Sequence, residues 1–189
     1  MNKEKELIDK LIDLAFAEDI GDGDHTTLSC IPATAMGKSK LLIKEAGVLA
    51  GIEVAKEIFN RFDPTMKVEV FINDGTEVEP GDVAMLVEGK VQSLLQTERL
   101  MLNVMQRMSG IATMTRKYAK KLEGTRTHVL DTRKTTPGMR ILEKMAVKIG
   151  GGVNHRIGLF DMILLKDNHV DFAGGIDKAI TLSLIHISE

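Results

Sequence analysis

The sequence predicts an α/β fold, and three observations support this prediction. Residues 127–165 show a βαβ pattern, in which a segment with helical spacing lies between two short apolar segments. Residues 67–89 hold short alternating segments separated by turn signals, and residues 91–124 form a long segment with a continuous apolar face. Strands interleaved with amphipathic helices are typical of an α/β protein.

Composition limits the classes of function. A chain of 189 residues can bury a core as one large domain or two small ones, and its formal charge of -2 does not favour nucleic acid as the main partner. One Tyr and no Trp leave little for base stacking. Cys30 has no second cysteine to pair with, which fits a reducing compartment. With no apolar run long enough for a bilayer and an acidic start unlike a signal peptide, we expect a cytoplasmic protein without a membrane partner.

The first elements follow from periodicity. Glu4–Glu18 has apolar residues on one stripe, which predicts a helix. The acidic, Gly-containing segment Asp19–Thr27 lacks the Gly and closing Glu of an EF-hand, so a structural loop is favoured over a calcium site. Met36–Lys44 is expected as a strand and Ile52–Phe62 as a helix, which ends before Asp63-Pro64 because the residue before proline avoids the α region.

The next segment supports an alternative function. Lys67–Ile72 alternates as a strand does, and Asn-Asp-Gly and Pro-Gly turns follow within residues 73–89. This pattern is similar to half of a biotinyl- or lipoyl-carrier domain. Such a carrier presents a modified lysine at a hairpin tip, and no suitable tip occurs here, because Asp177-Lys178-Ala179 lies far downstream in a helical context.

Residues 91–124 are expected to form the longest helical stretch, with a break at Ser109-Gly110. The methionine-rich apolar face of its first part predicts core packing or a subunit contact. Arg99 lies in this part, and by itself it is expected to be an ordinary surface residue.

The βαβ pattern places basic residues directly after two predicted strands. Thr127–Thr132 is followed by Arg133 and Lys134, and Asp161–Leu165 is followed by Lys166. Gly138–Ile149 is the predicted helix between them. Parallel strands end at one edge of a sheet or barrel, where such folds place their active sites, so we expect these side chains to gather there.

This arrangement predicts an anionic ligand. Arg133, Lys134, His155, Arg156 and Lys166 come from three separate loops, and their charges would repel without an anion among them. Arginine suits planar carboxylates and lysine suits phosphate, so the mixture indicates a ligand pair that carries both groups. The alternative is that each basic residue pairs with a nearby surface acid.

Five segments resemble one family closely. They are Thr97–Asn103, Ser109–Thr113, Asp131–Arg140, Gly151–Arg156 and Leu164–His169, and their order and spacing are those of the quinolinate phosphoribosyltransferases of de novo NAD synthesis. The resemblance runs from the first helix to about Leu182.

The resemblance implies roles for the site residues. The two carboxylates of quinolinate would be held by Arg133, His155, Arg156 and Lys166, with Arg99 contributed by the partner subunit of a homodimer. Lys134 and Lys166 would also reach the phosphoribosyl group and act as the catalytic residues, and Thr132 would lie against the substrate. The reaction implied is transfer from phosphoribosyl pyrophosphate, with Mg²⁺ bound to that substrate, and decarboxylation to nicotinate mononucleotide.

The resemblance also implies a domain plan. Residues 1–108 would form an N-terminal α/β sandwich with a dimer-forming helix, and residues 109–182 the first part of an open α/β barrel. The chain is expected to be truncated after the first barrel strands, without the acidic ribose and metal residues of the family, and residues 183–189 are expected to be a non-native tail. A relative acting on another ring (nicotinate, or the molybdenum-associated homologue) and an inactive fragment stay open as alternatives.

Overall fold

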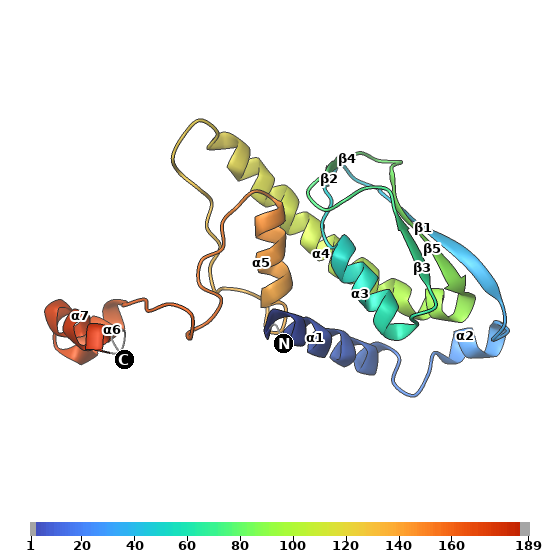
Figure 1. Cartoon of the computed structure of the whole chain (residues 1–189), viewed down its shortest axis with the longest axis horizontal. Helices are drawn as coiled ribbons and strands as arrows, with labels where there is room; N and C mark the ends of the chain where they lie inside the picture. Colours follow the sequence, from blue (N-terminus) through green and yellow to red (C-terminus); the bar gives the residue numbers. More distant parts are fainter. Residues whose placement is uncertain (1–2, 186–189) are drawn as a thin grey trace. The chain divides into compact units, whose positions relative to one another are not determined.

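The computed structural model describes residues 3–185 and divides into two units, one ending at His155 and one beginning at Arg156 (Figure 1). The first unit contains α1 (Lys3–Asp19), α2 (His25–Cys30), β1 (Met36–Leu42), β2 (Gly47–Val48), α3 (Ile52–Phe62), β3 (Lys67–Val70), β4 (Glu77–Val78), β5 (Val83–Lys90), α4 (Val91–Lys121) and α5 (Arg140–Ile149). The second unit contains α6 (Asp167–Ala173) and α7 (Ile176–Ile185). The mixture of helices and strands confirms the predicted α/β class, and the described strands do not close into a barrel.

An antiparallel sheet lies beside α4. Its strand order is β1-β5-β3, with Lys67 opposite Glu88 and Lys38 also opposite Glu88 across the central strand β5. β2 and β4 form a separate two-stranded pair. Apolar residues of β5 such as Met85 and Val87 are buried, because alternate residues of a strand face the same side and this side meets the helices.

Two apolar clusters form the core, and α4 contributes to both. Met108 and Ala112 join the cluster that contains α1, α3 and α5 residues, whereas Met101 and Met105 join the cluster under the sheet. In Figure 1, α3 and α5 both lie along α4, and these helix pairs are in contact. The methionine-rich face therefore packs in the core, as predicted.

The predicted break in the long helix is wrong, because α4 runs continuously from Val91 to Lys121. A glycine inside a helix costs about 1 kcal/mol relative to alanine. The buried side chains of Met108 and Ala112 on either side of Gly110 are completely enclosed in the core, and that packing offsets the cost.

The segment 19–27 was expected to be only a loop, but it contains the start of α2. Asp24 is the N-cap of this helix, and its carboxylate accepts a hydrogen bond from the Thr27 backbone N–H at 3.0 Å. The acidic residue therefore caps the following helix.

The two strands expected in the βαβ unit are not formed as predicted. Within Thr127–Thr132 only Leu130 makes a β-bridge, and its parallel partner is Val153. The expectation of a strand at Asp161–Leu165 is wrong, because a strand needs a paired neighbour and none of the described residues pairs with this segment.

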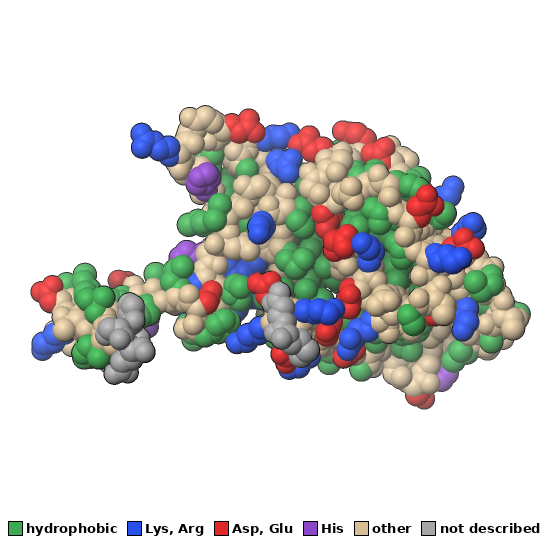
Figure 2. Space-filling model, in the orientation of Figure 1, with side chains coloured by type: hydrophobic (Ala, Val, Ile, Leu, Met, Phe, Trp, Pro, Cys, Tyr) green, Lys and Arg blue, Asp and Glu red, His purple; other side chains and the backbone are tan. Residues whose placement is uncertain are grey.

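The second unit exposes many apolar side chains. Phe172 is 94% exposed and Leu159 is 73% exposed, and hydrophobic side chains are visible on the surface of this unit in Figure 2. Ser183 to Ile185 belong to α7, whereas the rest of the proposed non-native tail, residues 186–189, lies outside the described residues. No helix within residues 3–185 has the length and apolar character needed to span a membrane.

Candidate active site

The Leu130–Val153 bridge brings two predicted site segments side by side. The Asp131 N–H donates to the Val153 carbonyl at 3.2 Å, and the Val153 N–H donates to the Val129 carbonyl at 2.8 Å. Thr132 follows the first of these segments, and His155 follows the second. A short parallel pairing is thus sufficient to place the ends of both segments together.

Basic side chains stand at the end of the first segment. Arg133 is half-buried, and its Nε–H is buried without a hydrogen-bond partner among the described residues. Lys134 and Thr132 are exposed, and the Lys134 backbone N–H donates to the Thr132 hydroxyl at 3.0 Å. A buried donor without a partner is costly, which makes Arg133 suited to receive an acceptor such as a carboxylate.

The loop after Lys134 is held by side chains that the sequence patterns did not single out. Arg107 on α4 pairs with Glu143 on α5 and also donates to the Thr136 hydroxyl at 2.6 Å. The Thr136 backbone N–H donates to Glu143 at 3.4 Å. Arg140 on α5 donates to the Thr135 hydroxyl at 3.0 Å. Both helices therefore fix the shape of the loop that presents Arg133 and Lys134.

A buried charge pair contacts the backbone of His155. Lys144 on α5 forms an ion pair with Asp131, and the two side chains are 3% and 6% exposed. The same two groups bind the backbone of His155, since its N–H donates to Asp131 at 2.9 Å and its carbonyl accepts from Lys144 at 2.9 Å.

Arg156 and Lys166 belong to the second unit. The Arg156 guanidinium donates to the Met162 carbonyl at 3.1 Å. Lys166 precedes α6 with an exposed side chain, and its backbone N–H donates to the His169 Nδ1 at 2.9 Å. The placement of these two residues beside Arg133 stays a prediction.

Arg99 is exposed on α4. It precedes Arg107 by eight residues, or about 12 Å along the helix axis. Within residues 3–185 no hydrogen bond or ion pair joins Arg99 to another predicted site residue. Among the described residues, Arg99 and Arg133 are therefore not joined by a direct polar contact.

Two acids that border the Arg133 loop are already paired. Lys144 takes Asp131 and Arg107 takes Glu143, and neither Arg133 nor Lys134 forms an ion pair with any described acidic residue. The alternative that each predicted basic residue pairs with a surface acid is therefore wrong for these two. Their charges remain available to an anion from solution.

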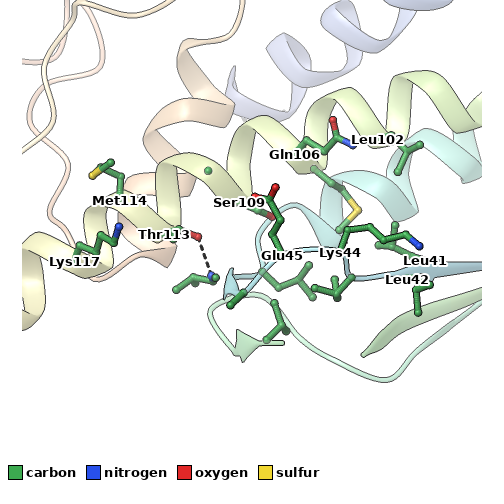
Figure 3. A pocket seen from close by; sticks show the side chains of 18 residues that line it. Leu41, Leu42, Lys44, Glu45, Leu102, Gln106, Ser109, Thr113, Met114 and Lys117 are labelled. Carbon is green, nitrogen blue, oxygen red and sulfur yellow. Dashed lines mark hydrogen bonds between the residues drawn. The ribbon is translucent and has the colours of Figure 1, made fainter. Parts of the chain in front are cut away.

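A groove of about 580 Å³ lies elsewhere in the first unit, between α4 and residues 41–49 (Figure 3). Leu42, Leu102 and Met114 line it, with Lys44 and Lys117 also on its wall. The segment Ser109–Thr113 supports this groove, as its hydroxyls bind the chain opposite. Ser109 accepts from the Ala50 N–H at 3.0 Å, and Thr113 accepts from the Val48 N–H at 2.8 Å.

Fold and site together define an α/β protein with basic side chains directly after a parallel pair of segments. Family models identify it further. Residues 24–109 match the quinolinate phosphoribosyl transferase N-terminal domain and residues 111–184 match the C-terminal domain of the same enzyme family. The chain belongs to the quinolinate phosphoribosyltransferase family.

Individual relatives agree with this assignment. Quinolinate phosphoribosyltransferase [decarboxylating] 1b of Nicotiana tabacum is 48% identical over 171 residues, which are 90% of this chain and 48% of that protein. A probable nicotinate-nucleotide pyrophosphorylase [carboxylating] of Synechocystis is 43% identical over 174 residues, with 92% of this chain and 59% of that protein covered. The chain thus spans about half the length of the curated relatives it matches.

Solved structures show the same fold. NadC from Streptococcus pyogenes matches with a TM-score of 0.89 and 41% identity over 95% of this chain and 64% of that one. The nicotinate-nucleotide pyrophosphorylase from Francisella tularensis matches with a TM-score of 0.89 and 38% identity. The match covers 97% of this chain and 65% of that one. Human nicotinic acid phosphoribosyltransferase matches with a TM-score of 0.57 and 14% identity, which shows a shared fold alone.

Proposed function

We propose that this chain provides the quinolinate-binding part of an enzyme that transfers a phosphoribosyl group to quinolinate. Phosphoribosyl pyrophosphate is the donor, and decarboxylation of the ring gives nicotinate mononucleotide, pyrophosphate and CO₂. The observation that carries this proposal is the pair Arg133 and Lys134, two basic residues at the end of one segment that have no acidic partner within residues 3–185. Family membership supplies the identity of the anions they would hold.

The two basic residues would bind different anionic groups. The guanidinium of Arg133 has a buried Nε–H without a partner among the described residues, and its fork can donate two parallel bonds to a ring carboxylate. Lys134 is exposed and can reach a phosphate as a point charge. His155, Arg156 and Lys166 would complete the binding of the dicarboxylate, and Thr132 would lie against the ring.

Catalysis would rest on position and charge. The pyridine nitrogen attacks the ribose carbon as pyrophosphate leaves, and fixed cations offset the charge that redistributes in the transition state. Residues 3–185 contain no group of three acidic, His or Cys side chains that could hold a metal ion. The ion would arrive with the phosphates of the donor.

We also propose a homodimer. Arg99 is exposed on α4 and lies about 12 Å along that helix from Arg107, which contacts the Arg133 loop. A second copy could supply the Arg99 that one copy does not bring to the site. A cytoplasmic location is the final part of the proposal.

Quinolinate binding by calorimetry tests this function. The chain should bind quinolinate saturably, Arg133→Ala should abolish binding, and nicotinate, with one carboxylate fewer, should bind weakly. Equal affinity for nicotinate would favour the relative that acts on another ring. A folded chain that binds neither ligand would be an inactive fragment, and sedimentation of the same samples would report the dimer.

A further inference from the structure

Asp131 and Lys144 form a buried ion pair that also binds both backbone polar groups of His155. Their side chains are 6% and 3% exposed. Asp131 Oδ1 accepts the His155 N–H at 2.9 Å, and Lys144 Nζ donates to the His155 carbonyl at 2.9 Å. Both backbone polar groups of His155 are therefore held by one pair of opposite charges.

The second carboxylate oxygen is used as well. With its amide nitrogen turned toward these groups, Asn154 donates to Asp131 Oδ2 at 2.8 Å and to the Lys144 carbonyl at 2.9 Å. The ion pair, Asn154 and the backbone of His155 thus form one connected polar cluster between α5 and the end of the parallel bridge.

Stability is a weak explanation for this cluster. Taking two charges out of water costs several kcal/mol each, and apolar replacements of buried ion pairs are often neutral or stabilising. What the pair provides is a fixed geometry. Asp131 is bonded to Thr132, which precedes Arg133, and the opposite end of the pair holds His155, so the two segments that carry predicted substrate ligands are tied to each other.

We propose that Asp131 and Lys144 are positioning residues, which keep the Thr132–Arg133 segment and His155 in register for the substrate dicarboxylate. This inference rests on the proposed function. Neither residue contacts substrate, because both are enclosed and each is engaged by the other. Loss of one hydrogen bond to a charged ligand raises its Kd about 10- to 100-fold, so loss of this register weakens binding without unfolding the chain.

The test is the double variant Asp131→Asn/Lys144→Met, which removes both charges but keeps an oxygen that can accept the His155 N–H. Lys148→Met is the control, because Lys148 lies on the same helix and is exposed. The double variant should unfold at the same or a higher temperature, whereas its quinolinate Kd, from calorimetry, should rise about 10- to 100-fold. The single variant Lys144→Met should lose both stability and binding, since it leaves the Asp131 charge buried alone.

A second readout does not depend on ligand. The backbone amide of His155 should be protected from hydrogen exchange in the wild type and in Lys148→Met. It should exchange faster in the double variant, because the variant loses the Lys144 bond to the His155 carbonyl and leaves only a neutral acceptor for the N–H. A double variant with wild-type affinity and wild-type protection overturns the proposal. If the folded wild type binds no quinolinate, the proposed function fails and the positioning role fails with it, whereas wild-type binding with an unaffected double variant rejects the positioning role alone.

Discussion

Arg107 and Glu143 form an ion pair that joins α4 to α5 beside the loop that presents Arg133. Glu143 is 9% exposed, and Arg107 is its only ion-pair partner among the described residues. The same carboxylate receives the Thr136 backbone N–H at 3.4 Å. One buried acid on α5 therefore links both helices to the site loop.

This pair predicts a loss of stability on substitution. Arg107→Met leaves the Glu143 carboxylate buried without its charged donor, which should lower the free energy of unfolding by about 1–3 kcal/mol. Urea denaturation measures the change. Arg126→Met, on the exposed loop after α4, is the control and should stay within about 0.5 kcal/mol of wild type. Equal effects of the two changes would show that the ion pair contributes nothing specific.

We expect Asp74 to make the stability of the protein depend on pH. Burial raises the pKa of Asp74, although its carboxylate accepts the Ile52 N–H at 2.9 Å at the start of α3. Because the folded pKa is higher than the unfolded value, the folded state binds the proton more tightly, and stability is lost as pH rises from the unfolded pKa through the folded one. Asp74→Asn keeps an accepting oxygen and removes this loss.

The variant should therefore gain stability relative to wild type as the pH is raised from 3 to 7. Urea denaturation of both proteins at each pH gives the difference, in which the other titrating groups cancel. A difference that stays constant, or that shrinks with rising pH, would contradict the raised pKa.

The elements that the sequence predicted well are those with strong local signals. The helix expected at Ile52–Phe62 has these bounds in the structure, because a helical apolar stripe precedes a proline that ends it. The break expected at Ser109-Gly110 is absent, since the cost of one glycine is small beside the packing of Met108 and Ala112. Tertiary contacts overrode a weak local preference.

In the candidate site, too, local sequence signals were predictive and tertiary contacts were not predicted. The apolar runs before Arg133 and Lys166 marked these two residues as candidates, and their gathering at one site stays a prediction. The strand expected at Asp161–Leu165 is absent, because strand formation depends on a partner elsewhere. The buried contacts of Asp131 with Lys144 were also beyond sequence reasoning. Residues 13 apart have no fixed relation until the chain folds, and no local pattern distinguishes this lysine from the exposed Lys148.

Gly150 predicts a packing conflict where α5 ends against α4. A Cβ at this position would lie 2.5 Å from the Ala112 carbonyl oxygen and 2.7 Å from the Thr115 Cβ, and the backbone oxygen cannot easily move. Gly150→Ala should therefore destabilise the protein by about 1–3 kcal/mol. Gly110→Ala is the matched change, because a Cβ there meets nothing within 4 Å and the helix gains about 0.5–1 kcal/mol. Thermal unfolding of both variants checks the opposite signs, and loss of stability in Gly110→Ala would contradict the open space at that site.

We expect Arg133 and Lys134 to bind different substrates, Arg133 quinolinate and Lys134 phosphoribosyl pyrophosphate. Arg133→Lys keeps the charge but removes the planar fork, so quinolinate affinity should fall about 10-fold or more while affinity for phosphoribosyl pyrophosphate with Mg²⁺ changes little. Lys134→Met should have the reverse pattern, because a point charge near phosphate is lost and the carboxylate fork remains.

Calorimetric titration of each variant with each ligand gives the four affinities. Lys148→Met, exposed on α5, should leave all of them unchanged. If both variants weakened both ligands equally, the two side chains would share one anion, and the division between carboxylate and phosphate would be wrong. If the Lys134 variant lost only quinolinate, the roles of the two residues would be exchanged.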